Sequence, residues 1–171
     1  TIEVSPSFGK YHLTGHRVCN VSFEPKDAEK LKNICPVCGK PLTIGVAARI
    51  EQLADRPEGF VPINAIPFKT ILPLQELLAS VFGSSITSKK VSALYSKLIE
   101  KFRSEFNVLL DASKKELDEI AGKDITQVIL DNRMGKIEVK GGYDGVYGVP
   151  IIQMNKDNKS EFIELYEVHG E

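Results

Sequence analysis

The sequence of 171 residues has few of the side chains that catalytic sites commonly use. It contains only three histidines and three cysteines, and His169 lies close to the C-terminus. These residues form no recognisable nucleophile–histidine–acid arrangement and no catalytic metal cluster. The glycines match neither the dinucleotide-binding pattern nor the P-loop pattern. We therefore expect no catalysis from this chain by itself.

Long apolar runs are also missing. No segment approaches the about 20 apolar residues that cross a bilayer, and the first residues do not resemble a signal peptide. The sequence predicts no membrane association and a cytoplasmic location. Three cysteines, two of them closely paired, favour a metal site in a reducing compartment over a disulfide framework. Since Thr1 leads directly into strand-like residues, we interpret the sequence as part of a longer protein.

The sequence has no overall excess of one charge, with 22 Lys and Arg against 23 Asp and Glu and a net charge of −1. Basic and acidic residues number 8 and 6 in residues 1–56, 9 and 8 in residues 57–123, and 5 and 9 in residues 124–171. The first two thirds are thus mildly basic, and the acidic excess lies at the end. This distribution permits a DNA-facing surface without requiring one.

The clearest motif consists of two pairs of metal-ligating residues. His16 and Cys19 are separated by two residues, as are Cys35 and Cys38, and fifteen residues lie between the pairs. A two-residue gap lets both side chains of a pair reach one ion, and thiolate and imidazole are ligands that Zn²⁺ prefers. Gly39 relieves crowding where backbone amides turn towards sulfur. The spacing predicts one structural zinc ion, with all four positions filled by protein.

Two alternatives to this ligand set remain open. His12 competes with His16 as the fourth ligand, although its distance from Cys19 in the sequence makes it the less favoured choice. Without a metal, Cys35 and Cys38 would be free thiols and Cys19 a core residue.

Apolar periodicity predicts an α+β fold that is mostly helical. We expect a zinc-ribbon or knuckle module, then a helical domain with a small β element near the C-terminus. The predicted domains are residues 1–46, residues 47–155 and an acidic tail at 156–171. Helices are expected at residues 25–33, 45–54, 74–82, 88–106, 113–121 and 124–132, and strands at 137–139 and 149–154. Ser88 is the expected cap of the helix at 88–106, and Gly122 is expected to end the helix at 113–121. Closely spaced prolines between residues 57 and 73 predict an extended, apolar segment packed on the body of the protein.

Residues 141–148 hold four glycines, two tyrosines and one aspartate. In the structural interpretation, Asp144 and Gly145 are the central pair of a tight β-turn and the tyrosines pack on the domain. In the functional interpretation, the glycines allow close approach to a ligand, while Tyr143 and Tyr147 stack on a base or bind a phosphate. The residues alone favour the structural interpretation.

Several motifs, in the same order, resemble the region that follows the catalytic domain in the endonuclease Q family and its bacterial relatives. The motifs are GKYHL (9–13), CPVCGKPLTIGV (35–46), LADRP (53–57), PFK (67–69) and GYDGVYG (142–148). The resemblance therefore covers most of the chain. Family members usually carry Cys at the position of His16, and the metal ligands of their N-terminal PHP (polymerase and histidinol phosphatase) phosphoesterase domain are not present in this sequence.

The resemblance implies a role in DNA repair, in which the PHP domain of the same polypeptide cleaves DNA beside a deaminated base or an abasic site. This chain would position the DNA, and the full-length protein would be a metal-dependent endonuclease. Arg56, Lys69, Lys89, Tyr143 and Tyr147 are the candidates for nucleic-acid contact. For Arg56 and Lys89 the alternatives are a helix-end charge and a solvated surface residue. The competing hypothesis is an interaction or interdomain docking module without DNA contact, which the near-neutral charge and the acidic tail favour.

Overall fold

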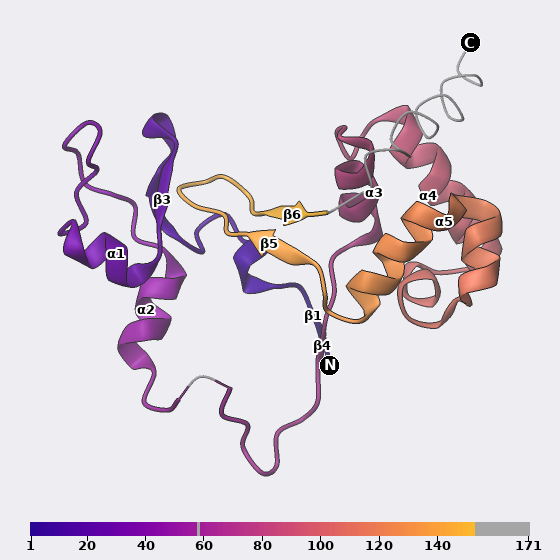
Figure 1. Cartoon of the computed structure of the whole chain (residues 1–171), viewed down its shortest axis with the longest axis horizontal. Coiled ribbons are helices and arrows are strands. Elements are labelled where there is room, and N and C mark those ends of the chain that lie inside the picture. The colour runs from indigo at the N-terminus through magenta and orange to yellow at the C-terminus, as the bar shows by residue number, and fades with distance from the viewer. Residues whose placement is uncertain (58, 153–171) are drawn as a thin grey trace. The chain divides into compact units, whose positions relative to one another are not determined.

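The computed structural model describes residues 1–57 and 59–152 (Figure 1). The fold class is α+β and mostly helical, as the sequence predicts, with five α-helices and three two-stranded sheets in the described part of the chain. The sheets pair β1 (Ile2–Glu3) with β4 (Lys69–Thr70), β2 (Thr14–His16) with β3 (Val21–Phe23), and β5 (Glu138–Lys140) with β6 (Val149–Ile151). No helix among these residues is long and apolar enough to cross a bilayer.

The chain divides into two compact units. Unit 1 consists of Thr1–Lys69 and Val139–Val149, and unit 2 of Thr70–Glu138 and the segment that begins at Pro150. The glycine-rich segment 141–148 thus belongs to the same unit as the paired Cys and His residues. The three-part division predicted from the sequence has other bounds and stays a prediction, and its acidic tail at 156–171 lies outside the described residues.

Unit 1 is built from short elements. The antiparallel strands β2 and β3 are joined by the 3₁₀ helix η2 (Arg17–Cys19), with His16 opposite Val21 in the register. Two short α-helices follow, α1 (Pro25–Lys30) and α2 (Val46–Leu53), and a 3₁₀ helix η1 (Pro6–Phe8) precedes β2. Pro25 starts α1, as expected of a residue without a backbone N–H in the first turn. The predicted helices at 25–33 and 45–54 are therefore present, each slightly shorter.

Unit 2 is a helical unit formed by α3 (Leu74–Phe82), α4 (Lys89–Phe102), a π-helical turn η3 (Asn107–Asp111) and α5 (Lys114–Arg133). Its core consists of leucine, isoleucine and valine side chains that the helices turn inward at helical spacing. The bounds of α3 equal the predicted ones, and the predicted cap of α4 is confirmed because Ser88 Oγ accepts a hydrogen bond from Val91 N. The predicted break at Gly122 is also present, with φ 78° and ψ 163° inside α5.

Helix α4 ends at Phe102, four residues before the predicted end. Arg103 has a left-handed φ of 71°, which terminates the helix. The predicted strands are present as β5 and β6, with β5 shifted by one residue; the predicted strand end at Met154 lies outside the described residues.

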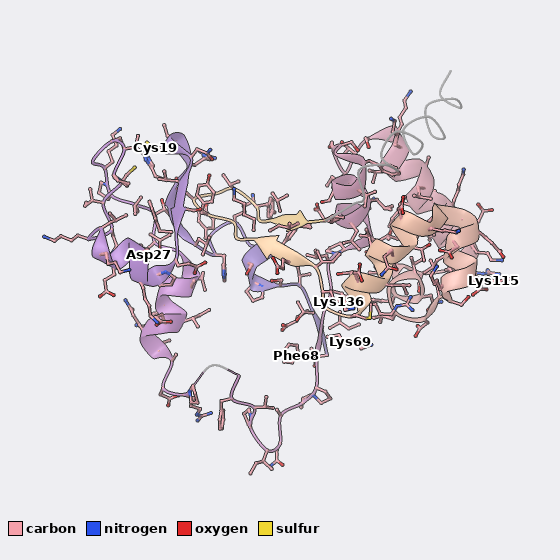
Figure 2. The ribbon with its side chains drawn as sticks, viewed as in Figure 1. Cys19, Asp27, Phe68, Lys69, Lys115 and Lys136 are labelled. Atoms are coloured by element: carbon pink, nitrogen blue, oxygen red, sulfur yellow. The ribbon has the colours of Figure 1, made fainter. Side chains whose placement is uncertain are left out.

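The proline-broken segment was predicted to pack on the body, and this prediction is wrong for most of it. Five large apolar side chains, those of Phe60, Val61, Ile63, Ile66 and Phe68, are 52–103% exposed. The backbone hydrogen bonds of its described residues before residue 67 close local turns, such as Ala65 N to Pro62 O. Prolines lack the N–H that sheet pairing requires, so this segment gains no strand partner until Lys69 (Figure 2). Only the end of the segment, at Ile71 and Leu72, is buried.

Candidate metal centre

The ligand atoms of His16, Cys19, Cys35 and Cys38 all lie within 4.8 Å of one another. We call these four residues the metal cluster; Figure 2 labels Cys19. His16 comes from the end of β2 and Cys19 from the end of η2, whereas Cys35 and Cys38 lie in the loop after α1. The Sγ of Cys38 is 3.3 Å from Nδ1 of His16, and Cys35 is only 1% exposed. The structure thus brings together the four residues that the spacing selects.

Local backbone geometry presents both pairs. Asn20 adopts a left-handed φ of 53° at the end of η2, and its N–H donates to the carbonyl of Arg17 over 3.0 Å. In the second pair, Cys35 N donates to Lys40 O and Gly39 N donates to Cys35 O, at 2.8 and 2.9 Å. Gly39 has φ 72° and open space beside its Cα, so the backbone angle is what requires glycine there.

The pKa values of two thiols of the metal cluster, Cys35 and Cys19, shift in opposite directions. Burial acts to raise the pKa of Cys35, but the backbone N–H groups of Cys38 and Val37, with the side chains of His16 and Cys38, outweigh it and lower this pKa to about 6. Burial is the largest cause that raises the pKa of Cys19 to about 11, helped by the hydrogen bonds and negative charge of Cys35 and Cys38. Thiolates this close repel one another, and a divalent cation between them removes that repulsion.

The donor set fits zinc. Zinc–sulfur bonds of about 2.3 Å in a tetrahedron place the sulfur atoms about 3.8 Å apart, and the observed separations reach at most 4.8 Å. Three thiolates and one imidazole are soft to borderline ligands, and four protein donors fill a tetrahedral site. When bound, such an ion cross-links the pair His16 and Cys19 to the pair Cys35 and Cys38.

His12, the alternative ligand, lies next to Ser7 and outside the group of the thiols. Its Nε2 lies 3.3 Å from Oγ of Ser7, and it is not among the residues that come together at the metal cluster. The backbone of His12 holds the start of α2, because its carbonyl accepts a hydrogen bond from Ala47 N at 3.0 Å. His16, and not His12, therefore lies close to the three thiols.

The glycine-rich segment forms a two-residue β-turn beside the metal cluster. Tyr143 and Val146 exchange two backbone hydrogen bonds of 3.0 and 2.8 Å. The central residues Asp144 and Gly145 have φ of 42° and 87°, and two positive φ angles are what a type I′ turn requires. The predicted tight turn, with Asp144 and Gly145 as the central pair, is confirmed. Of the two tyrosines predicted to pack on the domain, Tyr143 is buried, whereas Tyr147 is 57% exposed.

Both carboxylate oxygens of Asp144 are hydrogen-bonded. Arg17 N donates to Oδ2 at 2.7 Å, and Oγ1 of Thr43 donates to Oδ1 at 2.6 Å. The Arg17 N–H is the largest cause that lowers the pKa of Asp144, followed by the Thr43 hydroxyl. Asp144 is therefore held as a carboxylate between η2 and the segment that contains Thr43.

The five candidates for nucleic-acid contact are distributed over both units. Tyr143 is only 8% exposed, and its hydroxyl donates to Oδ1 of Asn20 at 2.8 Å. Tyr147 is 57% exposed, while Arg56 lies over the ring of Phe60 at 5.0 Å. The other two candidates are Lys69 in β4 and Lys89 at the first position of α4. Of the two tyrosines, Tyr147 is the one whose ring is open to a ligand.

Sequence reasoning missed a cation over the Tyr147 ring, and a second cation and a tyrosine near Gly145. Lys10 Nζ lies 4.6 Å from the centroid of the Tyr147 ring, a cation–π distance. A Cβ at Gly145 would lie 3.5 Å from Nη1 of Arg17 and 3.7 Å from the hydroxyl of Tyr11. We call Lys10, Tyr11, Arg17 and Tyr147 the turn surface. No periodicity links residues 10–17 with residues 144–147, so a single sequence carries no signal for this surface.

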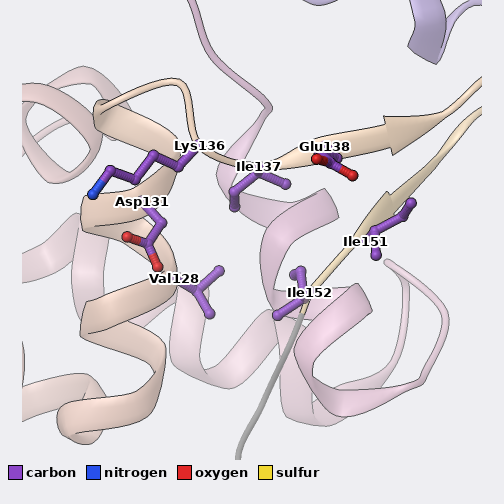
Figure 3. A pocket seen from close by; sticks show the side chains of 7 residues that line it. All are labelled: Val128, Asp131, Lys136, Ile137, Glu138, Ile151 and Ile152. Atoms are coloured by element: carbon purple, nitrogen blue, oxygen red, sulfur yellow. The ribbon is translucent and has the colours of Figure 1, made fainter.

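Unit 2 contains a separate pocket of about 250 Å³ (Figure 3). Its lining includes no histidine or cysteine, and its three charged residues, Asp131, Lys136 and Glu138, are of mixed sign. The other lining residues are Val128, Ile137, Ile151 and Ile152. Among the described residues, the metal cluster is the one group of three or more His, Cys, Asp or Glu residues placed to hold a metal ion. It is therefore the candidate site.

The chain thus combines a loop-rich unit, whose Cys and His cluster could hold a metal ion, with a helical unit. Residues 73–136 match the family model described as the MJ0043 C-terminal domain. The chain is 36% identical over 145 residues to the uncharacterized protein MJ0043 of Methanocaldococcus jannaschii, and 31% identical over 146 residues to the uncharacterized protein YqxK of Bacillus subtilis. Each alignment covers 85% of this chain, but only 18% and 33% of those proteins.

Two solved structures share the fold. One is the lesion-specific endonuclease PfuEndoQ from Pyrococcus furiosus, with a TM-score of 0.75 and 30% identity over 94% of this chain and 40% of that one. The other is endonuclease Q in complex with a 27-mer duplex substrate that has an abasic lesion at the active site. Its TM-score is 0.76, with 33% identity over 89% of this chain and 38% of that one. These similarities support an endonuclease Q-like relationship for the chain.

Proposed function

We propose that this chain is the zinc-stabilised, non-catalytic region of an endonuclease Q-like DNA repair protein. It positions DNA for cleavage, beside a deaminated base or an abasic site, by an N-terminal PHP domain of the same polypeptide. The observation that carries the proposal is the metal cluster within a fold that shares 30–33% identity with endonuclease Q structures. Because the chain spans less than half of those structures, the cleavage itself is assigned to the rest of the protein.

The zinc part of the proposal rests on the ligand chemistry. Four protein donors leave no coordination position for a water or a substrate, so the ion supports folding and does not take part in hydrolysis. Metal analysis is expected to find about one zinc per chain. His16→Ala should weaken zinc binding, whereas His12→Ala, the matched histidine control, should leave it nearly unchanged. The reverse order of effects would make His12 the ligand and contradict the assignment.

The DNA part is supported by the turn surface. Lysine and arginine bind phosphates, and exposed aromatic rings stack on unpaired bases. The Lys10 ammonium lies over the Tyr147 ring, and Arg17 and Tyr11 lie near Gly145 of the same turn. A strand with a displaced base would meet a cation and a ring at one place.

Fluorescence anisotropy with intact, abasic and single-stranded oligonucleotides tests this assignment. We expect weak, salt-dependent binding and no cleavage when Mg²⁺ or Mn²⁺ is added. Tyr147→Ala and Lys10→Ala should reduce affinity, each by about 10-fold. Lys115→Ala, which removes the same charge from the surface of α5 (Figure 2), is the control and should change little. Absence of binding to all three DNAs at low salt would remove the support for DNA positioning.

A docking module is the second candidate, and an exposed apolar surface favours it. Val46, Ile50 and Leu53 form one stripe of α2, and each is more than half exposed. The apolar segment that follows α2 is exposed as well, and exposed apolar patches of this kind mark interaction sites. Under this candidate, Ile50→Asp weakens association with the separately expressed PHP domain, and DNA affinity is unchanged. Loss of DNA affinity with intact association would instead favour the first candidate.

A further inference from the structure

The turn at residues 143–146 contacts both ends of the loop that carries the first pair of metal-cluster residues. That loop is η2 with its cap Asn20, and it places His16 before it and Cys19 at its end. Asp144 Oδ2 accepts the N–H of Arg17 at the start of η2, at 2.7 Å. The hydroxyl of Tyr143 donates to the side chain of Asn20 directly after Cys19, at 2.8 Å. Two consecutive residues therefore hold the loop at its two ends.

Asp144 also reaches the chain that follows the second pair. Its Oδ1 accepts a hydrogen bond from Oγ1 of Thr43 at 2.6 Å. Thr43 and Gly15 exchange backbone hydrogen bonds of 3.0 and 2.9 Å, next to His16. On its other side, Leu42 N donates to Asn33 O at 2.8 Å, beside the loop that contains Cys35. One carboxylate thus joins the two segments whose separation sets the distance between the ligand pairs.

The turn also packs closely against the backbone of the segment that precedes β2. The backbone of Gly142 lies against Gly9 O, and a Cβ there would overlap this oxygen. Gly145 N donates to Lys10 O at 3.0 Å, and Leu13 N donates to Gly142 O at 2.8 Å. The turn is therefore anchored to the segment before β2 as well as to η2.

We propose that Asp144 and Tyr143 are positioning residues for the metal cluster, and that Thr43 is the link through which Asp144 acts on the second pair. This inference rests on the proposed zinc site. Ligand geometry depends on the hydrogen bonds around the ligands, and loss of such bonds typically weakens metal affinity by about 10–100-fold. A carboxylate that accepts an N–H and an O–H makes charge-assisted bonds, which are stronger than bonds between neutral groups. The turn therefore holds His16 and Cys19 at the distance from Cys35 and Cys38 that one ion needs.

The test compares zinc affinity, by chelator competition, and the rate of zinc release in four variants of the full chain. Asp144→Asn removes the negative charge and one of the two acceptor oxygens that bond Arg17 N and Thr43, and Tyr143→Phe removes the hydroxyl that bonds Asn20; both preserve side-chain size. Each should weaken zinc binding by about 10-fold or more and speed its release, while stoichiometry stays near one. Thr43→Val should act in the same direction, and Thr43→Ser, which keeps the hydroxyl, should retain affinity close to that of the unaltered protein.

Tyr95→Phe is the control, because it removes a tyrosine hydroxyl that donates to Glu105 in unit 2, at 3.0 Å. It should leave zinc binding unchanged. Cobalt substitution adds a readout that general destabilisation would not move: the visible d–d bands of the Asp144→Asn protein should shift as ligand geometry loosens. If either turn variant fails to fold, the Thr43 pair decides the matter.

Three outcomes overturn the inference. One is unchanged affinity and release in Asp144→Asn, Tyr143→Phe and Thr43→Val. Another is an equal effect in Tyr95→Phe, which would assign the change to general stability. If the unaltered protein binds no zinc, the zinc proposal fails along with the inference, whereas the first two outcomes leave the zinc proposal intact.

Discussion

At the scale of single residues, two of the four glycines of segment 141–148, Gly142 and Gly148, are explained by close approach of backbones. A Cβ at Gly142 would lie 2.6 Å from both Gly148 N and Val146 O, besides its overlap with Gly9 O. A Cβ at Gly148 would lie 2.9 Å from Lys140 O and would overlap Ser7 O. Real Cβ atoms do not approach backbone atoms so closely, and backbone atoms cannot rotate away as a flexible side chain can. The glycines therefore pack the turn into unit 1.

Gly142→Ala is expected to destabilise unit 1 by about 1–3 kcal/mol, the usual cost of overpacking. Gly59→Ala is a useful comparison, because Gly59 has φ 78° but open space around its Cα. Its cost is the left-handed backbone alone, about 1–2 kcal/mol, in a segment outside the packed turn. Chemical denaturation of the zinc-loaded proteins measures both. If Gly142→Ala were as stable as the unaltered protein, the close approach of these backbones would not be a constraint.

The metal cluster was predictable from the sequence because its signal is local. A two-residue gap within each pair is a property of neighbouring residues, and ligand chemistry follows from residue type. The contacts of the turn were not predictable. Tyr143 and Asp144 bond to Asn20 and Arg17, which are 123 and 127 positions away. No pattern of charge or periodicity in one sequence relates residues so far apart, so the burial of Tyr143 and the role of Asp144 required the structure.

At the scale of elements, short-range signals predicted most helix bounds of unit 2. The prediction failed where residues distant in the sequence determine the local structure. Ser88 caps α4 and Gly122 interrupts α5, as the sequence predicts, and Ser113 caps α5. The predicted continuation of α4 to Phe106 is wrong because the chain turns at Arg103 into the π-helical turn η3. The guanidinium of Arg133, more than 20 residues away, donates hydrogen bonds to three carbonyls of this turn and its C-cap. These are Leu109 O at 2.9 Å, and Val108 O and Ala112 O at 3.0 Å.

The N-terminus of α5 should make unit 2 more stable at neutral pH than at acid pH. Glu116 N donates to Ser113 Oγ at 3.3 Å, and the Ser113 hydroxyl donates to Glu116 Oε2 at 2.6 Å. The hydroxyl is the largest cause that lowers the pKa of Glu116. A carboxyl whose pKa is lower in the folded state stabilises the fold above its unfolded value of about 4.3, and this contribution is lost as pH falls through the folded pKa.

Glu116→Gln should therefore remove part of the loss of stability on acidification. Thermal unfolding of unit 2 between about pH 3 and pH 7, followed by circular dichroism, measures the effect. Glu119→Gln on the same helix is the control, because it removes a carboxylate without removing the bond to Ser113. Ser113→Ala should cost about 1 kcal/mol at neutral pH through loss of the cap. Equal acid sensitivity in Glu116→Gln and the unaltered protein would contradict the role of this capping pair.

At the scale of the whole molecule, the two units differ in what stabilises them. Of the buried apolar side chains among the described residues, nineteen belong to unit 2 and only four to unit 1. The four in unit 1 are Ala28, Cys35, Leu42 and Tyr143, and one of these belongs to the metal cluster. A unit with so small an apolar core usually depends on disulfides or a metal for a stable fold. Zinc binding would therefore supply stability that unit 1 lacks and unit 2 does not need.

Removal of the metal should speed amide hydrogen exchange in unit 1 and leave exchange in unit 2 unchanged. Because ligand binding and folding are coupled in metal-dependent modules, a strong chelator should accelerate amide exchange throughout β2, β3 and α1. Helices α3, α4 and α5 should keep their protection, since their leucine-rich core contains no metal ligand. Exchange measured by mass spectrometry on the full chain, with and without chelator, gives both results in one experiment. Restored protection on addition of zinc, but not of Mg²⁺, would identify the thiol-binding ion as the cause. Equal loss of protection in α3–α5 would show that the units do not fold independently, and unchanged protection in β2 and β3 would show that unit 1 is stable without the metal.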